Sequence, residues 1–183
     1  MSSEEPAAEI APEAAAPEEE VPAQEEAVAK VLKGSQDQIE TTFAIVKPDA
    51  RQDAPSIIKA AEEAGFVVAH SRVLTMTPQM AREFYSEHYG KNFFGTLVEF
   101  MTSGECIALA LRKANAVADW RTLIGPTSSL RAKEQAPDSL RARFGTDNTK
   151  NACHGSASIP EALAELSYFG DVEALGDLFT IQL

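Results

Sequence analysis

From residue 41 onward, apolar residues recur along the chain with two different periods. The shorter period, of about two residues, predicts strands. The run Thr42–Val46 is apolar and β-branched, and it ends at Lys47, where a proline begins a turn. Phe66–Met76 alternates well enough for a second strand, and Cys106–Leu111 is typical of a buried one. A further strand is expected to lead into His154. The pattern therefore predicts four strands.

The longer period, of 3.6 residues, predicts helices between these strands. Ser56–Ala64 has this spacing and is followed by Gly65, a residue that commonly ends a helix. Thr77-Pro78 is typical of a helix start, and Ser158 can cap the last helix. The predicted helices cover residues 56–64, 78–89, 93–102, 116–124, a short segment from 138, and 159–169, while 125–137 is predicted to be a loop.

Strands and helices thus follow the order β-α-β-α-α-β-α-β-α, without an internal repeat. This order suits an α+β fold of the ferredoxin-like, split βαβ kind. We expect a sandwich in which a four-stranded antiparallel sheet has surrounding helices, and we expect these helices on one face of the sheet. A chain of 183 residues, 44% of them apolar, is long enough for one such domain with a sizeable core.

Charge is concentrated near the N-terminus. The first 40 residues hold eleven acids against two lysines, so most of the net charge of −12 falls there. The segment 1–38 is rich in Glu, Ala and Pro and cannot bury enough apolar surface to offset its ordering entropy. We predict an acidic arm over 1–38 that is disordered or orders on a partner, a domain over 41–170, and a C-terminal tail over 171–183.

Composition argues against several functional classes. An acidic chain is not expected to bind nucleic acid or anionic membranes. No segment has the pattern of a signal peptide, and none approaches the ~20 apolar residues that span a bilayer. Cys106 and Cys153 fit free thiols in a reducing compartment. We therefore expect a soluble, cytoplasmic protein.

The segment Asn151–Ser156 carries the clearest chemical signal. It places His154 beside a glycine and a hydroxyl, just before a predicted helix start. Backbone N–H groups at a helix start favour an anion, and an imidazole there can act as nucleophile or proton carrier toward phosphate. By itself the motif is equally compatible with a polar histidine in an ordinary loop.

Several cationic and polar residues extend this signal. Each has an ordinary explanation on its own, as a strand terminus, a surface helix residue or a turn former. Phosphoryl transfer, however, needs several cations and hydrogen-bond donors around the moving phosphate and little else from a protein. Besides His154, the candidate residues of these types in this one small domain are Lys47, Arg121, Thr127, Arg141 and Asn151.

Five short motifs resemble those of the nucleoside diphosphate kinase family. They are Thr42–Asp49, Glu87–Tyr89, Phe93-Phe94, Met101–Gly104 and Asn151–Ser156, and their order and spacing agree over roughly residues 41–170. The chain is most similar to the flagellar and sperm branch, whose members occur in axonemes and radial spokes. Two features suggest that branch: a short join from Tyr89 to Phe93, and a longer loop over 130–137.

The resemblance implies a role for each matching residue. His154 would accept the γ-phosphate of a nucleoside triphosphate and pass it to a diphosphate through a phosphohistidine, while Ser156 and Glu165 orient the imidazole. Phe93 would stack on the base, and Mg²⁺ would arrive with the nucleotide. The remaining nucleotide-binding residues implied by the resemblance are Lys47, Tyr89, Arg121, Thr127, Arg141 and Asn151.

Two departures from the family pattern leave a second hypothesis open. Ala157 replaces the acid that usually follows His-Gly-Ser, and the segment after Tyr89 is tighter than usual. The first hypothesis is an active nucleoside diphosphate kinase in the cytoplasm, within the axoneme of a cilium or flagellum. The second is a weakly active or non-catalytic structural subunit of an axonemal, radial-spoke complex. Family members assemble as homo-oligomers, and axonemal proteins are the expected further partners.

Overall fold

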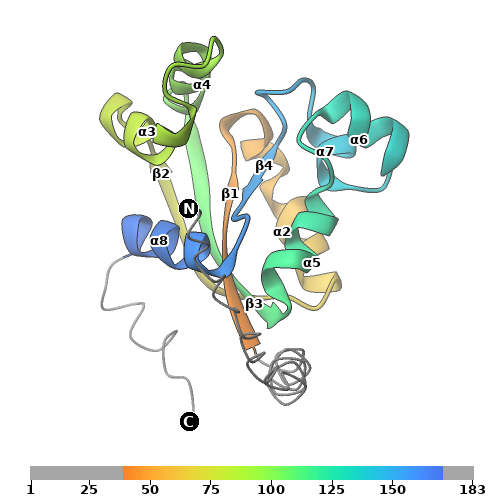
Figure 1. Ribbon diagram of the computed structural model, residues 1–183. Helices are drawn as coiled ribbons and strands as arrows, with labels where there is room; N and C mark the ends of the chain where they lie inside the picture. Colours follow the sequence, from red (N-terminus) through yellow and green to blue (C-terminus); the bar gives the residue numbers. More distant parts are fainter. Residues whose placement is uncertain (1–38, 171–183) are drawn as a thin grey trace, which may run out of the picture. The chain divides into compact units, whose positions relative to one another are not determined.

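Four strands form one antiparallel sheet in the computed structural model, which describes residues 39–170 (Figure 1). The strands are β1 (Ile39–Val46), β2 (Val67–Thr75), β3 (Glu105–Ala114) and β4 (Cys153–Gly155), and their order in the sheet is β2-β3-β1-β4. All three pairings are antiparallel. The predicted α+β fold with a four-stranded antiparallel sheet is confirmed. The predicted arm 1–38 and tail 171–183 lie outside the described residues.

Helices and 3-10 turns connect the strands. They are η2 (Pro48–Asp53), α2 (Ala54–Glu63), α3 (Pro78–Phe84), η3 (Ser86–His88), α4 (Phe94–Met101), α5 (Ala116–Ile124), α6 (Ser129–Gln135), α7 (Leu140–Phe144) and α8 (Ile159–Phe169). Among residues 39–170, no helix is both long and apolar enough to cross a bilayer.

Local signals in the sequence located most helix ends correctly. Gly65 follows α2 with a φ of +87°, a conformation that glycine adopts without steric strain. The Thr77 hydroxyl accepts a hydrogen bond from the N–H of Met80 at 3.1 Å, as expected for an N-cap. Ser158 likewise accepts from the N–H of Glu161 at 3.3 Å.

Two predictions about helices were wrong. The segment 125–137 is not all loop, because α6 begins after Ser128, whose hydroxyl caps it. This helix buries only small side chains, Ser129 and Ala132, so it has no large apolar stripe that the sequence pattern could reveal. The helix predicted over 78–89 ends at Phe84, and the chain continues as the 3-10 turn η3.

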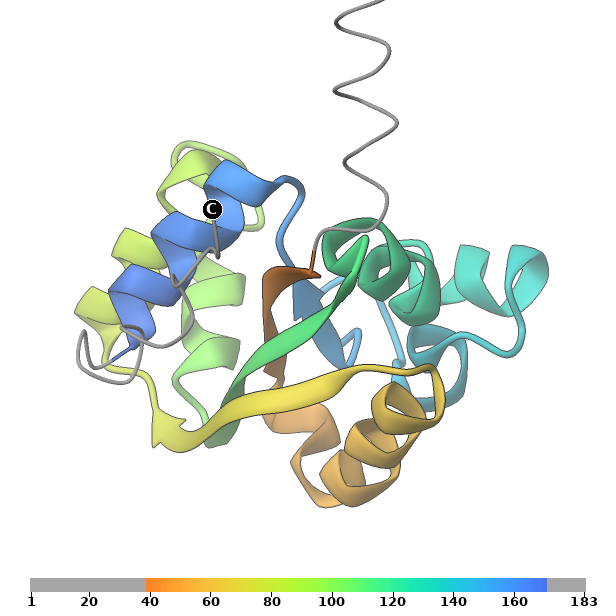
Figure 2. The same cartoon turned by 90° about the horizontal axis from the view of Figure 1, so that it is seen from below.

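Helices cover both faces of the sheet, so the expectation of a single covered face was also wrong. Successive residues of β1 belong to different cores: Phe43 and Ile45 pack with α3, α4 and α8, whereas Ala44 and Val46 pack with α2, α5 and α7. Figure 2 shows the strands running between these two groups of helices. A strand buried on both faces has a continuous apolar run, which is the pattern of Thr42–Val46.

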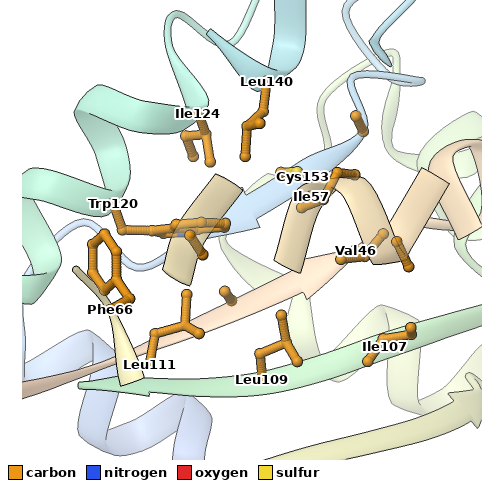
Figure 3. Close-up of a cluster of buried hydrophobic side chains, with 14 of the residues drawn as sticks. Val46, Ile57, Phe66, Ile107, Leu109, Leu111, Trp120, Ile124, Leu140 and Cys153 are labelled. Atoms are coloured by element: carbon orange, nitrogen blue, oxygen red, sulfur yellow. The ribbon is translucent and has the colours of Figure 1, made fainter. Parts of the chain in front are cut away.

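The second of these cores fixes the short strand β4. Trp120 of α5 is fully buried in it against Phe66, with ring centroids 5.9 Å apart (Figure 3). Its indole N–H donates to the backbone oxygen of His154 at 3.0 Å. A Cβ on Gly155 would overlap the Trp120 ring, so only glycine fits there. The core therefore determines where the backbone of His154 lies.

Candidate active site

A cavity of about 1020 Å³ opens beside β4. Its lining comes from segments far apart in the sequence: the end of β1, η3 and α4, the end of α5 with the loop after it, α7, and residues 148–157. Seven of the residues singled out by sequence line this one cavity: Lys47, Phe93, Arg121, Thr127, Arg141, Asn151 and His154.

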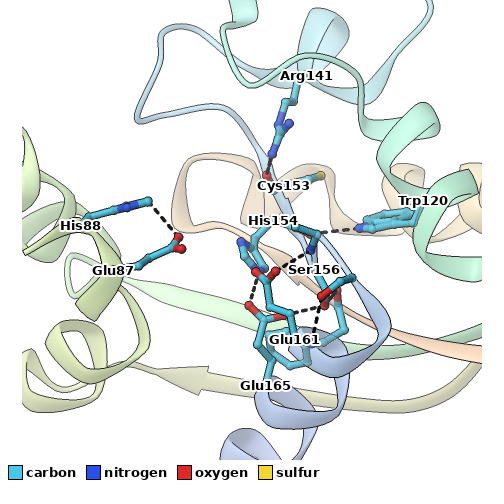
Figure 4. A network of polar contacts seen from close by, with 12 residues as sticks. Glu87, His88, Trp120, Arg141, Cys153, His154, Ser156, Glu161 and Glu165 are labelled. Atoms are coloured by element: carbon cyan, nitrogen blue, oxygen red, sulfur yellow. Dashed lines mark hydrogen bonds and ion pairs between the residues drawn. The ribbon is translucent and has the colours of Figure 1, made fainter. Parts of the chain in front are cut away.

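The imidazole of His154 is oriented by a carboxylate from α8. Its Nε2 lies 2.7 Å from Oε1 of Glu165, and Oε2 of Glu165 accepts a hydrogen bond from the hydroxyl of Ser156 at 2.5 Å (Figure 4). Because a carboxylate only accepts, this contact places the imidazole proton on Nε2. Nδ1 has no hydrogen-bond partner among residues 39–170, so it is the nitrogen left for a ligand in the cavity.

This arrangement assigns distinct positions to the two predicted orienting residues. Glu165 contacts the ring directly, whereas Ser156 contacts Glu165 and acts on the ring through it. The Glu165 side chain is 11% exposed and that of His154 is 18% exposed. Sequence alone could not distinguish these positions, because both depend on how α8 packs against β1.

Aromatic side chains surround the His154 ring on its other sides. The ring centroids of Phe84, Phe43 and Tyr85 lie 5.1, 6.2 and 6.3 Å from that of His154. These rings leave the imidazole little freedom to turn, so its Nδ1 keeps a fixed direction. Such preorganisation is what nucleophilic attack on a bound group requires.

Tyr85, rather than Tyr89, is the tyrosine beside this histidine. Tyr89 is 82% exposed, does not line the cavity, and packs its ring on Phe94 at 5.8 Å. Tyr85 lines the cavity and is 5% exposed, and its buried hydroxyl has no hydrogen-bond partner among the described residues. Burial also raises the pKa of Tyr85, so the hydroxyl stays protonated and can donate to a ligand.

The position of Tyr85 changes the count behind the inference of a tight join. That inference counted from Tyr89 to Phe93, which are four positions apart. Tyr85, the tyrosine at the cavity, stands eight positions before Phe93. The sequence signal that could have distinguished the two tyrosines is the apolar face of α3, which continues to Tyr85.

Lys47 is the most deeply buried cation of the cavity. Its side-chain nitrogen donates to Oδ1 of Asn151 at 2.7 Å, and only 6% of the residue is exposed. Burial, and next the charge of Arg141, lower the pKa of Lys47 from 10.5 to about 8. The ammonium is thus charged at neutral pH but poorly solvated, and an anion in the cavity would stabilise it.

Arg141 is held by backbone oxygens. Its Nη1 donates to Gly125 at 2.8 Å, and its Nη2 donates to Cys153 at 2.9 Å. Burial is the main cause that lowers its pKa to about 10, so it remains a cation at neutral pH. These bonds fix the guanidinium at the base of the cavity, where it adds positive charge near Lys47.

Asn151 connects parts of the cavity wall. Besides accepting from Lys47, its side-chain amide donates to the backbone oxygens of Thr127 and Asn148 at 2.9 and 3.1 Å. It is 2% exposed. Its amide hydrogens are therefore committed to the protein, and its main effect is to hold the Thr127 loop against Lys47.

Two arginines of the cavity have no ion-pair or hydrogen-bond partner for their guanidinium groups within residues 39–170. Arg121 lies in the last turn of α5, and Arg131 lies on α6. Sequence reasoning missed Arg131 because it placed that residue in a loop. The cavity thus combines two fixed buried cations with two that are available to a ligand.

Carboxylates are few around the cavity. Of its lining residues only Glu87 and Glu161 are acidic, and within the described part of the chain no group of three or more His, Cys, Asp or Glu is placed to hold a metal ion. Glu161 Oε2 accepts from the N–H of Ala157 at 3.0 Å, so it brings a carboxylate next to the position where the usual acid is missing. This donor set fits a divalent cation that arrives on phosphates.

Both cysteines are free and fully buried. Burial raises the pKa of the Cys153 thiol to about 12 and that of Cys106 to about 11. Although Cys153 precedes His154, its side chain packs in the core that contains Trp120 and Ile57. The thiol next to the histidine is therefore unreactive and turned away from the cavity.

The burial of Lys47 predicts a pH dependence of stability. The folded-state pKa of about 8 lies below the ordinary 10.5, so between these values the unfolded chain binds more protons and stability rises with pH. This difference in pKa lowers the free energy of unfolding by about 3 kcal/mol at pH values below 8. In Lys47→Met this rise should disappear. Urea unfolding of the ligand-free protein at pH 7 and pH 10 measures it.

The exposed Lys59 offers a matched control, because its side chain is 73% exposed on α2. Lys59→Met should keep the pH dependence of the unmodified protein. Equal changes in unfolding free energy between pH 7 and pH 10 for Lys47→Met and the unmodified protein would contradict the assignment of a lowered pKa to Lys47.

Comparison with known proteins gives one consistent result. The family model "Nucleoside diphosphate kinase" matches residues 40–174. Nucleoside diphosphate kinase homolog 5 of Danio rerio is 42% identical over 130 residues, which cover 71% of this chain and 60% of that protein. The chain spans smaller shares, 22% and 33%, of two other relatives.

The matches to solved structures cover a larger share of the matched chains. The nucleoside diphosphate kinase of Aquifex aeolicus is 40% identical, with a TM-score of 0.71, and the match covers 73% of this chain and 96% of that one. The Halobacterium salinarum enzyme in complex with CDP is 32% identical, with a TM-score of 0.68, and covers 73% and 89%.

Proposed function

Since the chain belongs to the nucleoside diphosphate kinase family, we propose that it transfers the γ-phosphate of a nucleoside triphosphate to a nucleoside diphosphate through a phosphohistidine at His154. The observation that carries the proposal is the orientation of this ring. Its Nε2 is occupied by Glu165, and its Nδ1 is left for the cavity that Lys47 and Arg141 line.

In the first half of the reaction, Nδ1 attacks the γ-phosphorus while the bond to the leaving diphosphate breaks. The imidazole then carries a positive charge that the Glu165 carboxylate balances through Nε2–H. In the second half, an oxygen of the incoming diphosphate attacks the same phosphorus, and Nδ1 recovers its lone pair. The imidazole keeps its Nε2 proton throughout.

The nucleotide would lie along the cavity with its phosphates toward His154. Lys47, Arg121 and Arg141 supply positive charge there. The hydroxyl of Tyr85, which has no partner within residues 39–170, supplies a donor. Thr127 and Asn151 form the wall that positions Lys47. The half-exposed ring of Phe93 offers a face on which any base can stack.

Mg²⁺ bound to the phosphates would neutralise part of their charge. Of the two carboxylates in the cavity lining, Glu161 stands at the amide of Ala157, the position of the missing acid, and is the one we propose lies nearest that cation. It would substitute for the missing acid and lessen the effect of that departure on activity.

A second function remains proposed alongside the first, namely a weakly active or non-catalytic structural role in an axonemal, radial-spoke complex. It is favoured by the alanine at position 157 and by the resemblance to the flagellar and sperm branch. We further propose a cytoplasmic location in the cilium or flagellum, axonemal proteins as partners, and self-association, as the resemblance implies. An acidic arm over 1–38 and a tail over 171–183 remain predictions.

Incubation of the purified protein with Mg²⁺ and γ-labelled ATP tests the kinase function. Phosphohistidine is labile in acid and stable in alkali, so a label with that behaviour should appear on the protein and pass to added GDP or CDP. Binding of nucleotide without labelling would instead favour the structural function. Absence of both labelling and nucleotide binding would overturn the kinase proposal.

A further inference from the structure

A second imidazole, that of His88, lines the same cavity and has no part in the reaction proposed above. It stands at the end of η3, and its side chain is 26% exposed. Its ring contacts the rings of two other residues. The ring of Tyr85 is nearly parallel to it at a centroid distance of 6.2 Å, and the ring of Phe93 meets it edge-to-face at 5.4 Å and 68°.

Charged neighbours fix the orientation of this ring. The side-chain nitrogen of Lys91 lies 3.1 Å from Nδ1 of His88, and Oε1 of Glu87 lies 3.4 Å from Nε2 (Figure 4). An ammonium only donates, so Nδ1 is the acceptor and the ring proton is on Nε2, toward the carboxylate. Both nitrogens of His88 are therefore directed at protein groups, which leaves the carbon edge and the faces of the ring for other contacts.

Phe93, in contrast, is partly exposed and has few aromatic or cationic neighbours. It is 45% exposed and precedes the first turn of α4, and its only other described aromatic or cationic neighbour is Lys91, whose side-chain nitrogen lies 5.8 Å from its ring centroid. An exposed ring that can change rotamer loses conformational freedom when it stacks on a ligand, and a contact that holds it beforehand reduces that loss.

We propose that His88 is a positioning residue that holds the Phe93 ring ready to stack on the base of a bound nucleotide. The inference rests on the proposed function, in which Phe93 is the stacking residue. The imidazole, which Lys91 and Glu87 contact through its two nitrogens, supplies the edge-to-face contact to Phe93, and the ring of Tyr85 stacks on the imidazole. This series of ring contacts connects Tyr85, which lies beside His154, through His88 to Phe93.

Nucleotide affinity tests this role. The dissociation constant for ADP with Mg²⁺, measured by calorimetry, should rise roughly two- to tenfold in His88→Ala, the range expected for loss of one aromatic pair. KM should rise by a similar factor, with kcat unchanged. His88→Phe keeps a ring in place and should bind ADP about as well as the unmodified protein. His70→Ala, on β2 and outside the cavity lining, serves as the control.

A double-mutant cycle then separates positioning from direct contact. If His88 acts through Phe93, adding His88→Ala to Phe93→Ala should change the dissociation constant no further. Equal weakening in both backgrounds, or failure of His88→Phe to restore binding, would mean that the imidazole contacts the nucleotide itself and would overturn the proposal. So would unchanged affinity in His88→Ala. An unmodified protein that binds no ADP would instead overturn the proposed function, and this inference with it.

Discussion

His154→Ala is expected to lose phosphoryl transfer almost completely, with kcat reduced by at least ~10⁴-fold. The reason is that no other described side chain presents an unbonded nucleophilic nitrogen beside the cavity at a fixed angle. Glu165 holds the His154 ring at Nε2 and the rings of Phe84 and Tyr85 pack against it, so Nδ1 keeps its direction. Transfer from γ-labelled ATP to GDP, followed over time, measures the change.

Nucleotide binding should survive this substitution, because the cations of the cavity remain. The dissociation constant for ADP is therefore expected to change little, which distinguishes loss of the nucleophile from loss of the fold. His70→Ala provides the matched control, since it removes an imidazole from an edge strand. Labelled protein that persists in His154→Ala would show that another residue accepts the phosphate.

Glu165→Gln is expected to lower kcat by roughly 10²- to 10⁴-fold, with little change in affinity for nucleotide. A glutamine can keep a contact to Nε2 at similar geometry, but it has no charge to balance the positive imidazole that forms during attack. It can also donate from its amide, which would favour the tautomer with the proton on Nδ1, where no lone pair remains for phosphorus.

Ser156→Ala tests the positioning of the Glu165 carboxylate separately from its charge. It removes the hydroxyl that donates to Oε2 of Glu165 at 2.5 Å while leaving the carboxylate in place, so its effect on kcat should be smaller than that of Glu165→Gln. Stopped-flow measurement of the phosphorylation step alone compares the two variants. A Glu165→Gln protein with normal kcat would contradict the orienting and charge-balancing role of this residue.

The short-range predictions succeeded where the relevant interactions are themselves short-range. Gly65, Thr77 and Ser158 end or begin helices through backbone dihedral preferences and hydrogen bonds to residues a few positions away. Signals of this kind depend on a few consecutive residues and not on how the rest of the chain packs. The segment Asn151–Ser156, in contrast, indicated a site only together with the distant cations and the family resemblance, and the structure places Asn151 and His154 at the cavity.

Most of the errors concern features that long-range packing decides. Tyr89 was assigned because it belongs to the Glu87-His88-Tyr89 motif, yet Tyr85 at the end of α3 lines the cavity and Tyr89 lies on the surface. The helix α6 was missed because it buries only small side chains. Coverage of both sheet faces could have been inferred from the continuous apolar runs of β1 and β3.

The sequence by itself thus determined the order of the strands and most helices along the chain, the antiparallel α+β class, and which histidine shares a cavity with three of its four cations, Lys47, Arg121 and Arg141. The tertiary structure alone decided which imidazole nitrogen is left for a ligand, and that Lys47 is buried and poorly solvated. The physical reason is separation along the chain. Lys47 and Asn151 are 104 positions apart, and contacts of that kind depend on the packing of the whole sheet with its helices.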